Sequence, residues 1–357
     1  MPMDKKLNSI IEKLIGRGGL EKEEYIYLID NRNEESALAL AKQATQIRKG
    51  IYGDSVYIRG LIEISNICKN DCYYCGIRKS NKLCQRYRLK NEEILSCADM
   101  GYALGFRTFV LQGGEDGFFT DEVLVELISG LKKKYSDCAV TLSLGERSYE
   151  SYKRLYNAGA DRYLLRHETA NDEHYRRLHP ENLTLENRMK CLKNLRAIGF
   201  QVGCGFMVGS PYQTTEDIAN DLKFIEEFKP DMCGIGPFIP HKDTPFKDFS
   251  AGTVELTCYL LSIIRIIHPP VLLPATTALG SIEEGGREKG ILCGANVVMP
   301  NLSPEEARKN YALYNNKLSV GAESAEGLLS LKKRIESIGY KIVTDRGDIK
   351  LNRKEDV

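Results

Sequence analysis

The sequence predicts an α/β protein built as a (β/α)8 TIM barrel, with an N-terminal helical extension and a short C-terminal extension. Two observations lead to this prediction. After residue 53, short segments rich in β-branched residues recur, separated by stretches of roughly 15–25 residues with helical periodicity. Strands that alternate with helices form parallel sheets, and eight such strand segments favour a closed barrel over an open sheet. The chain of 357 residues is long enough for a barrel of about 250 residues plus extensions.

The sequence pattern of residues 1–53 predicts two or three helices that pack on the barrel. The stretches "NSIIEKLI" and "EESALALAKQATQIRK" place apolar residues at i, i+3 and i+4, and neither contains proline. The barrel is predicted over residues 54–305. Further helical pattern and "IGYKIVTDRGD" follow over 306–357, which we expect to be an extension that closes the barrel.

The predicted strands share apolar starts and polar or glycine-containing ends, such as "QGGED", "SLGE" and "MVGSP". They span 56–65, 108–114, 139–145, 162–168, 201–209, 232–238, 272–278 and 296–301. In a parallel barrel the carboxyl ends of all strands meet at one mouth, where active sites are found. The sequence therefore predicts a binding site at that mouth.

Composition limits the partners and the compartment. The 50 basic and 49 acidic residues give a net charge of +1, which gives no reason to expect nucleic acid as a partner. The charged start shows no signal peptide, and the most apolar region, 258–280, contains Arg265, His268 and three prolines, so it does not predict a membrane span. We expect a cytoplasmic protein, in which 11 cysteines indicate metal binding or burial rather than disulfides.

Cys68, Cys72 and Cys75 form a C-x3-C-x2-C cluster directly after the first predicted strand. Closed sites for soft metals normally use four ligands. One interpretation is a structural zinc with Cys84 as the fourth ligand, and another is a buried cluster without metal, which the polar surroundings disfavour. A third is a 4Fe–4S cluster that leaves one iron open to a small molecule. A position at the catalytic end of a barrel favours the third, with Cys84 as a bystander.

The cysteine spacing, with Tyr74 before the last cysteine, resembles the signature of the radical S-adenosylmethionine (SAM) superfamily. The resemblance implies that the amino and carboxylate groups of SAM complete the fourth iron, and that Tyr74 packs near the adenine. It also implies an enzyme that cleaves SAM reductively to a 5′-deoxyadenosyl radical. In such an enzyme the cofactor supplies the radical chemistry, and the protein orients it and excludes water.

Two further motifs end the second and the fourth predicted strands. The glycines of "QGGED" (112–116) allow backbone groups to approach a ligand, and the motif resembles the superfamily segment that holds the SAM ammonium group. In "LLRHETAN" (164–171), alternation sends Arg166 and Glu168 to one face and His167 to the other, where we expect a hydrogen-bonding role in the core. A carboxylate inside the barrel can bind ribose hydroxyls or the sulfonium charge. Arg188 can pair with the SAM carboxylate, although without the resemblance a surface arginine is the simpler interpretation.

Taken together, "RYLLRHETAN", "TLSLGE", "GIGPFIPHKDTP", "PATTALG", "EGGRE" and "CGANVVMPN" resemble the HydE family of radical SAM maturases of iron–iron hydrogenase. The resemblance runs from about residue 50 to 314. It implies assembly of the hydrogenase active-site cluster, from a small anionic iron complex with cysteine, CO and cyanide made by a companion maturase. The implied partners are an electron donor such as flavodoxin or ferredoxin, and transient contacts with other maturases.

Carried over by motif, the resemblance assigns the cluster to Cys68, Cys72 and Cys75, and it assigns no catalytic residue. Around SAM it places Tyr74, Gln112, Gly113, Gly114, Glu168, Arg188 and Met232. Along the substrate cavity it places Arg59, Thr141, Arg162, Arg166, Thr276, Thr277, Tyr311 and Tyr314. Buried charge needs a partner, which an anionic substrate would supply.

One departure from the family pattern concerns the number of clusters. Some relatives carry a second cysteine trio near the C-terminus, whereas the sequence from Asn301 onward has no cysteine. We therefore expect one 4Fe–4S cluster. Two alternatives to the HydE assignment stay open at this stage, a sister radical SAM mutase of the methylornithine synthase type and a zinc-stabilised binding protein without turnover. Biotin synthase fits less well, because the other barrel cysteines do not suggest its sulfur-donating cluster.

Overall fold

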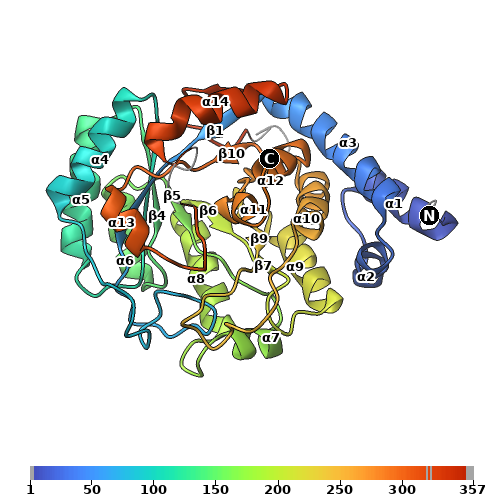
Figure 1. Cartoon of the computed structure of the whole chain (residues 1–357), viewed down its shortest axis with the longest axis horizontal. Coiled ribbons are helices and arrows are strands. Elements are labelled where there is room, and N and C mark those ends of the chain that lie inside the picture. The colour runs from blue at the N-terminus through green and yellow to red at the C-terminus, as the bar shows by residue number, and fades with distance from the viewer. Residues whose placement is uncertain (1–3, 319–320, 322–323, 351–357) are drawn as a thin grey trace.

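A computed structural model describes residues 4–318, 321 and 324–350. It shows a closed barrel of parallel strands surrounded by helices (Figure 1). Six strands form one sheet in the order β2-β3-β4-β5-β6-β8. Parallel bridges Met232–Leu272 and Pro274–Val297 continue the ring to β10 and β1, and the bridge Leu61–Asn301 closes it. The prediction of a (β/α)8 barrel is confirmed.

The strands are shorter than predicted. They are β1 (Ser55–Ile58), β2 (Gly60–Ser65), β3 (Thr108–Gly113), β4 (Ala139–Ser143), β5 (Arg162–Leu164), β6 (Gln201–Cys204), β7 (Met207–Val208), β8 (Met232–Cys233), β9 (Gly236–Pro237), β10 (Val297–Val298) and β11 (Lys341–Val343). The predicted strand 201–209 breaks at Gly205, where φ is +146° and a Cβ would lie 2.0 Å from Gly234 O. This glycine lets two neighbouring backbones approach closely.

The predicted strand 272–278 is wrong for most of its length. Only Leu272 and Pro274 form isolated bridges, and helix α11 already begins at Thr277. Pro274 has no N–H to donate, so it cannot support a continuous ladder. At this position the isolated bridges of Leu272 and Pro274 complete the ring of strands, and no regular strand forms.

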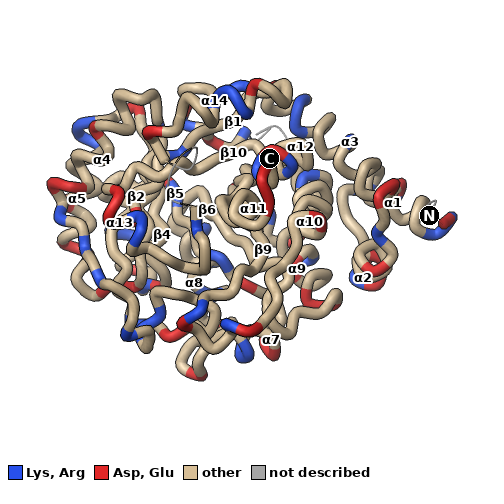
Figure 2. Tube along the Cα trace, in the orientation of Figure 1, with Lys and Arg blue, Asp and Glu red and all other residues tan. Residues whose placement is uncertain are grey.

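Helices form the outer layer of the barrel, and most of them bury one apolar face. They are α1 (Lys5–Arg17), α2 (Lys22–Asp30), α3 (Glu34–Tyr52), α4 (Asn91–Ala103), α5 (Asp121–Lys134), α6 (Tyr149–Asn157), α7 (Asp172–Leu178), α8 (Leu185–Ile198), α9 (Thr215–Phe228), α10 (Val254–Ile267), α11 (Thr277–Ile282), α12 (Gly286–Leu292), α13 (Glu305–Asn310) and α14 (Leu328–Ser337). Acidic and basic residues are interspersed over this exterior (Figure 2). Among the described residues, no helix combines the length and apolar character that a membrane crossing needs.

The three N-terminal helices pack beside α9 and α10 (Figure 1). The Tyr25 hydroxyl donates to Glu226 on α9 at 2.9 Å, and the Tyr259 hydroxyl on α10 donates to Leu28 O at 3.1 Å. One continuous apolar core includes side chains from all three predicted segments, such as Leu14, Phe109 and Leu331. The boundaries at 53 and 305 stay predictions, because the described segments share this core.

The C-terminal extension contains a strand that the sequence analysis missed. Strand β11 pairs in parallel with β1, on the side opposite β10. Beyond it, residues 345–350 cross the amino-terminal end of the barrel and contact β3, β5 and β6. The end of the barrel away from the predicted site is therefore closed by the C-terminal segment. The charged residues 353–357 lie outside the described part of the chain.

Candidate active site

The carboxyl ends of the strands surround a cavity of about 400 Å³. Its wall carries residues from the cysteine loop, from the ends of β2, β3 and β4, from the segment after β5, and from residues 311–317. Cys68, Cys72 and Cys75 all line it. Most of the predicted site residues also line it, namely Tyr74, Gln112, Gly113, Gly114, Arg166, Glu168, Arg188, Thr276, Thr277, Tyr311 and Tyr314. Motifs that lie far apart in the sequence thus meet at one mouth.

Backbone contacts and one arginine fix the shape of the cysteine loop. The Cys75 N–H donates to Cys72 O at 3.3 Å, and the Glu115 N–H donates to Cys68 Sγ at 3.4 Å. Arg86 donates to carbonyl oxygens of the loop, including Ile77 O at 2.7 Å and Arg78 O at 2.6 Å. These bonds satisfy backbone groups that no regular element pairs, and they fix the path of the loop.

The three thiols suit an iron–sulfur centre. Burial raises the pKa of Cys68, Cys72 and Cys75, to about 12 for Cys75, and the neighbouring cysteines raise the pKa values of Cys72 and Cys75 further. Thiolates are the metal-binding form, and a bound cationic centre would supply the charge that stabilises them. In the described residues, no three His, Cys, Asp or Glu side chains gather closely enough for a single metal ion.

Cys84 lies apart from the cavity wall. Its Sγ accepts a long hydrogen bond from Asn66 Nδ2 at 3.6 Å, and it is not among the residues that line the cavity. Its role as a bystander stays a prediction.

Gly114 brings the end of β3 directly against the cysteine loop. A Cβ at this position would lie 2.3 Å from Ile67 O and 2.8 Å from the Cβ of Cys68. The Gly114 N–H donates to Ser65 O at 3.0 Å, and Asp116 Oδ2 accepts a hydrogen bond from the Ser65 hydroxyl at 2.7 Å. Only glycine fits at this approach, which explains the "GG" that the sequence analysis singled out.

Charged side chains gather where β5 ends. Glu168 Oε2 lies 3.3 Å from Arg166 Nη2. Arg188, on α8, donates from Nε to Glu146 Oε1 at 2.5 Å and from Nη1 to Arg166 O at 2.7 Å. Arg188 is therefore buried at the site and is no surface residue, and Glu146 is a partner that the sequence analysis did not find.

An aromatic pair lies beside the cysteines. The Tyr74 hydroxyl is 3.2 Å from Nε2 of His179, and the two rings meet edge to face with centroids 5.4 Å apart. Burial lowers the pKa of His179 to about 3, so the ring is neutral. Nδ1 of His179 is 3.0 Å from Tyr175 O, which is an acceptor, so Nε2 accepts from Tyr74. Tyr74 is thus fixed with its ring against the cavity.

Three of the predicted residues line a second, smaller cavity of about 20 Å³ deeper in the barrel. Arg59 and Thr141, predicted for the substrate, and Met232, predicted for SAM, lie there and not on the wall of the large cavity. Arg59 Nη1 lies 2.8 Å from Met232 Sδ, and burial lowers the pKa of Arg59 well below its usual value. Met232 is thus separated from the residues predicted to surround SAM.

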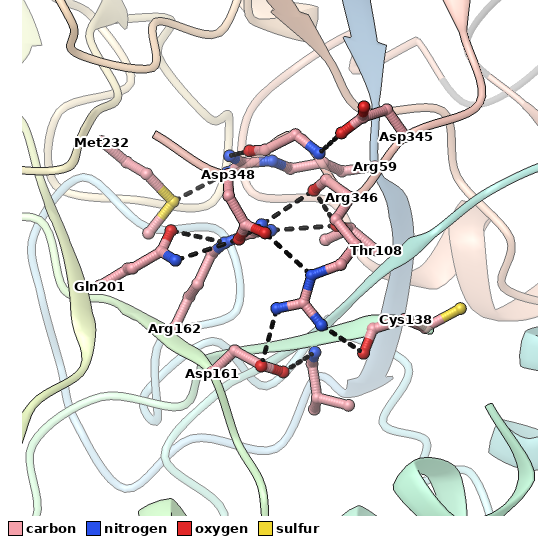
Figure 3. Close-up of polar contacts among 12 residues, drawn as sticks. Arg59, Thr108, Cys138, Asp161, Arg162, Gln201, Met232, Asp345, Arg346 and Asp348 are labelled. Atoms are coloured by element: carbon pink, nitrogen blue, oxygen red, sulfur yellow. Dashed lines mark hydrogen bonds and ion pairs between the residues drawn. The ribbon is translucent and has the colours of Figure 1, made fainter. Parts of the chain in front are cut away.

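The prediction for Arg162 is corrected by its contacts (Figure 3). Arg162 lines neither of these cavities, and its guanidinium donates to Asp348 Oδ1 at 2.5 Å, Arg346 O at 2.8 Å and Thr108 Oγ1 at 3.0 Å. The charge of this buried arginine has a carboxylate of the C-terminal segment as its partner. It needs no anionic substrate, contrary to the argument from buried charge.

Glu63 and Lys317 line the large cavity and were missed by the sequence analysis. Glu63 is fully buried on β2, and Lys317 Nζ donates to its Oε1 at 2.5 Å and to Tyr311 O at 3.1 Å. The sequence did carry a signal for Glu63, which is the lone carboxylate in the apolar stretch "GLIEIS". Nothing in the sequence indicated that its partner would come from 254 positions later.

Comparisons with known proteins agree with this arrangement. A family model described as the radical SAM superfamily matches residues 62–225, which include the cysteine loop, the "QGGED" segment and Glu168. The FeFe hydrogenase maturase subunit HydE of Thermotoga maritima is 45% identical over 309 residues, covering 87% of this chain and 88% of the relative. This chain belongs to the HydE family of radical SAM enzymes.

Other relatives are more distant from this HydE-family chain. The 3-methylornithine synthase of Methanosarcina acetivorans is 26% identical and covers 92% of both chains. The crystal structure of methylornithine synthase (PylB) superposes with a TM-score of 0.82 at 25% identity, covering 94% of this chain and 97% of that one. The hydrogenase maturase HydG, with a TM-score of 0.80 at 21% identity over 96% of this chain and 76% of that one, shows the same fold. Membership of the superfamily implies a 4Fe–4S cluster and SAM as cofactors.

Proposed function

We propose that this radical SAM enzyme acts in the assembly of the iron–iron hydrogenase active-site cluster, as a maturase of the HydE type. The observation that carries the proposal is the 45% identity to the Thermotoga maritima maturase over 87% of the chain, against 26% to 3-methylornithine synthase. The cavity supports it, since the cysteine trio, the glycine-rich end of β3 and the charged end of β5 all face the same space.

Within this function, Cys68, Cys72 and Cys75 hold the only 4Fe–4S cluster of the protein. Bound there together, the cluster and SAM supply reductive cleavage of SAM to a 5′-deoxyadenosyl radical. The limit to one cluster is supported by the sequence from Asn301 onward, which contains no cysteine.

SAM lies beside the cysteine loop in this proposal. Gly113 and Gly114 bring backbone groups to its amino-acid end, and Arg188 orients the carboxylate. The carboxylate of Glu168 accepts from the ribose hydroxyls, and Tyr74 packs against the adenine. The support is that the side chains or backbone of these residues line the large cavity with the three cysteines. Met232, in the deep cavity, is left out of this set.

The substrate is a small anionic iron complex that lies deeper in the barrel. Arg166, Thr276 and Tyr311 would bind it in the large cavity, and Arg59 and Thr141 would bind it at the deep end. One observation supports this placement. The Thr276 hydroxyl and Nε of both Arg59 and Arg166 are buried without a hydrogen-bond partner among the described residues, and buried donors of this kind call for a ligand. The electron donor would be a flavodoxin or ferredoxin, and a companion maturase would supply the complex.

A maturation assay tests the function. The anaerobically reconstituted protein is added to a lysate that contains apo-hydrogenase and the other maturases but no HydE. We expect hydrogenase activity to appear, and to depend on SAM. SAM cleavage without any hydrogenase activity would contradict the maturase assignment. Mass spectrometry of the lysate for 3-methylornithine then tests the mutase alternative.

A further inference from the structure

Glu168 has a backbone conformation that is unusual for a residue with a Cβ. Its φ is +67°, in the left-handed region. Its side chain lines the large cavity and is 10% exposed, close to Arg166. A residue in this conformation persists only where its surroundings over-determine it. The groups that hold the segment therefore bear directly on the site.

Gly205, between β6 and β7, holds the segment from one side. The Glu168 N–H donates to Gly205 O at 3.0 Å, and the Gly205 N–H donates to Nδ1 of His167 at 3.3 Å. A Cβ at position 205 would lie 2.0 Å from Gly234 O, so this backbone has no room to move toward the next strand. One glycine thus fixes both the His167 ring and the Glu168 backbone.

Asp221, on α9, holds the segment from the other side. Its Oδ1 accepts from the Ala170 N–H at 2.6 Å and lies 3.1 Å from Nε2 of His167. Because Nδ1 accepts from Gly205, the ring proton is on Nε2 and is donated to Asp221. One carboxylate therefore binds residues on both sides of Glu168 in the sequence.

Burial makes this arrangement rigid. His167 and Asp221 are both 0% exposed, and the His167 ring packs edge to face on Phe224 with centroids 4.7 Å apart. Neither residue is among those that line the large cavity. Their hydrogen bonds reach the site through the backbone of residues 167–170.

We propose that His167 and Asp221 are positioning residues, which hold the Glu168 carboxylate in the cavity where it contacts SAM. This inference rests on the proposed assignment of Glu168 to SAM. Without the contacts to Gly205 and Asp221, Glu168 relaxes to a negative φ and its side chain turns away from the cavity. SAM then binds more weakly, while the turnover of bound SAM is retained.

The test compares SAM binding and SAM cleavage in reconstituted holoenzyme variants. His167→Phe keeps an aromatic ring against Phe224 but removes both ring nitrogens, and Asp221→Val removes the acceptor. We expect both variants to raise the KM for SAM and its Kd about 5–20-fold with kcat changed less than about threefold. This range corresponds to about 1–2 kcal/mol at 1.4 kcal/mol per tenfold. Asp221→Asn retains an accepting oxygen and should restore SAM affinity to within about threefold of wild type.

His268→Phe is the matched control, because it also removes a buried histidine. It ends α10 and lines neither cavity. The control should lose comparable thermal stability without a change in the KM for SAM. If the control raises the KM as much as His167→Phe, the effect is general destabilisation and the inference is overturned.

The dependence on Glu168 is checked with Glu168→Ala. Added to Glu168→Ala, His167→Phe should weaken SAM binding no further, because the group that it positions is gone. If His167→Phe weakens SAM binding as much in Glu168→Ala as in the wild type, the positioning role is overturned while the assignment of Glu168 to SAM stands. A normal KM in both His167→Phe and Asp221→Val has the same consequence. Unchanged SAM affinity in Glu168→Ala would overturn this inference together with the assignment of Glu168.

Discussion

Arg162 and Asp348 form an ion pair, with 2.5 Å between Nη2 and Oδ1, across the amino-terminal end of the barrel (Figure 3). The Arg162 side chain is fully buried on β5, whereas Asp348 is 40% exposed in the C-terminal segment. Arg346 strengthens the closure, since it pairs with Asp348 at 2.9 Å and with Asp161 at 3.0 Å. The C-terminal segment therefore neutralises a buried charge as well as covering the barrel.

Asp348→Asn should destabilise the protein without changing SAM cleavage. The substitution leaves the Arg162 guanidinium buried without a carboxylate, which we expect to cost about 1–3 kcal/mol after allowance for the exposure of Asp348. Urea unfolding at pH 7 measures the change. Asp345→Asn, in the same segment, keeps an oxygen for the Gly347 N–H and should shift stability by less than about 0.5 kcal/mol. Equal stabilities for Asp348→Asn and wild type would show that the ion pair between Arg162 and Asp348 does not stabilise the fold.

The buried histidines should make the protein less stable as the pH falls below neutrality. Burial lowers the pKa of His268 from its ordinary 6.5 to about 4. Between those values the unfolded chain binds a proton that the folded chain does not. The stability from the neutral ring is fully present above pH 6.5 and is lost as the pH falls toward 4.

His268→Leu tests this sign. Urea unfolding at pH 7.5 and pH 5.5 should show that the variant loses about 1 kcal/mol less than wild type over this interval. His268 ends α10, away from both cavities, so SAM cleavage serves as the internal control. Parallel pH dependences in the two proteins would contradict the lowered pKa.

The local motifs of the site were predictable from the sequence. The cysteine loop, the "QGGED" turn and the "RHE" segment each lie within a few residues of a strand end. His167 lies in the core and Glu168 in the cavity, as predicted. The predicted reason was wrong, because β5 ends at Leu164 and Glu168 has a left-handed backbone, so strand alternation does not set these orientations.

What could not be predicted depends on pairing between distant segments. Strand β11 and Asp348 reach the barrel only after the chain has passed around it, so the partner of Arg162 lies 186 positions away. The same holds for Lys317 and Glu63, which are separated by 254 positions. The breaks at Gly205 and near Pro274 follow from close backbone approach and from a missing N–H, which strand propensity does not register.

Lys317→Met should be more harmful than the double substitution Glu63→Gln with Lys317→Met. The single change leaves the fully buried carboxylate of Glu63 without its ammonium partner. Burial raises the pKa of Glu63, and Lys317 is the main group that lowers it. We expect a loss of about 3–5 kcal/mol for Lys317→Met and a smaller loss for the double variant. Urea unfolding of the holoenzymes measures both. A double variant that loses as much stability as Lys317→Met, or more, would contradict a direct pair between the two side chains.

Arg188→Lys should weaken SAM binding by about tenfold. A lysine cannot donate to Glu146 and to the Arg166 carbonyl in the geometry of the guanidinium. Equilibrium dialysis of reconstituted holoenzyme with SAM measures the affinity. Arg177→Lys, which affects an exposed pair with Glu173 on α7, is the matched control and should bind SAM normally. Normal SAM affinity in Arg188→Lys would remove this residue from the proposed site.

The cysteine loop gives a further prediction for the metal content. Cys72→Ala should lose the cluster and all SAM cleavage, because the remaining two thiolates cannot hold it. Cys84→Ala should keep both, since Cys84 does not line the cavity. Iron analysis after anaerobic reconstitution and assay of 5′-deoxyadenosine measure these effects. Retained cleavage in Cys72→Ala would contradict the assignment of the trio.

The most direct test of the account is electron paramagnetic resonance of the reduced, reconstituted protein with and without SAM. The account predicts about four iron and no zinc per chain, together with a 4Fe–4S signal that changes when SAM is added. The change is expected because SAM binds the iron that the three cysteines leave open. A signal that stays the same with SAM, or one zinc per chain in place of iron, would contradict the central claim.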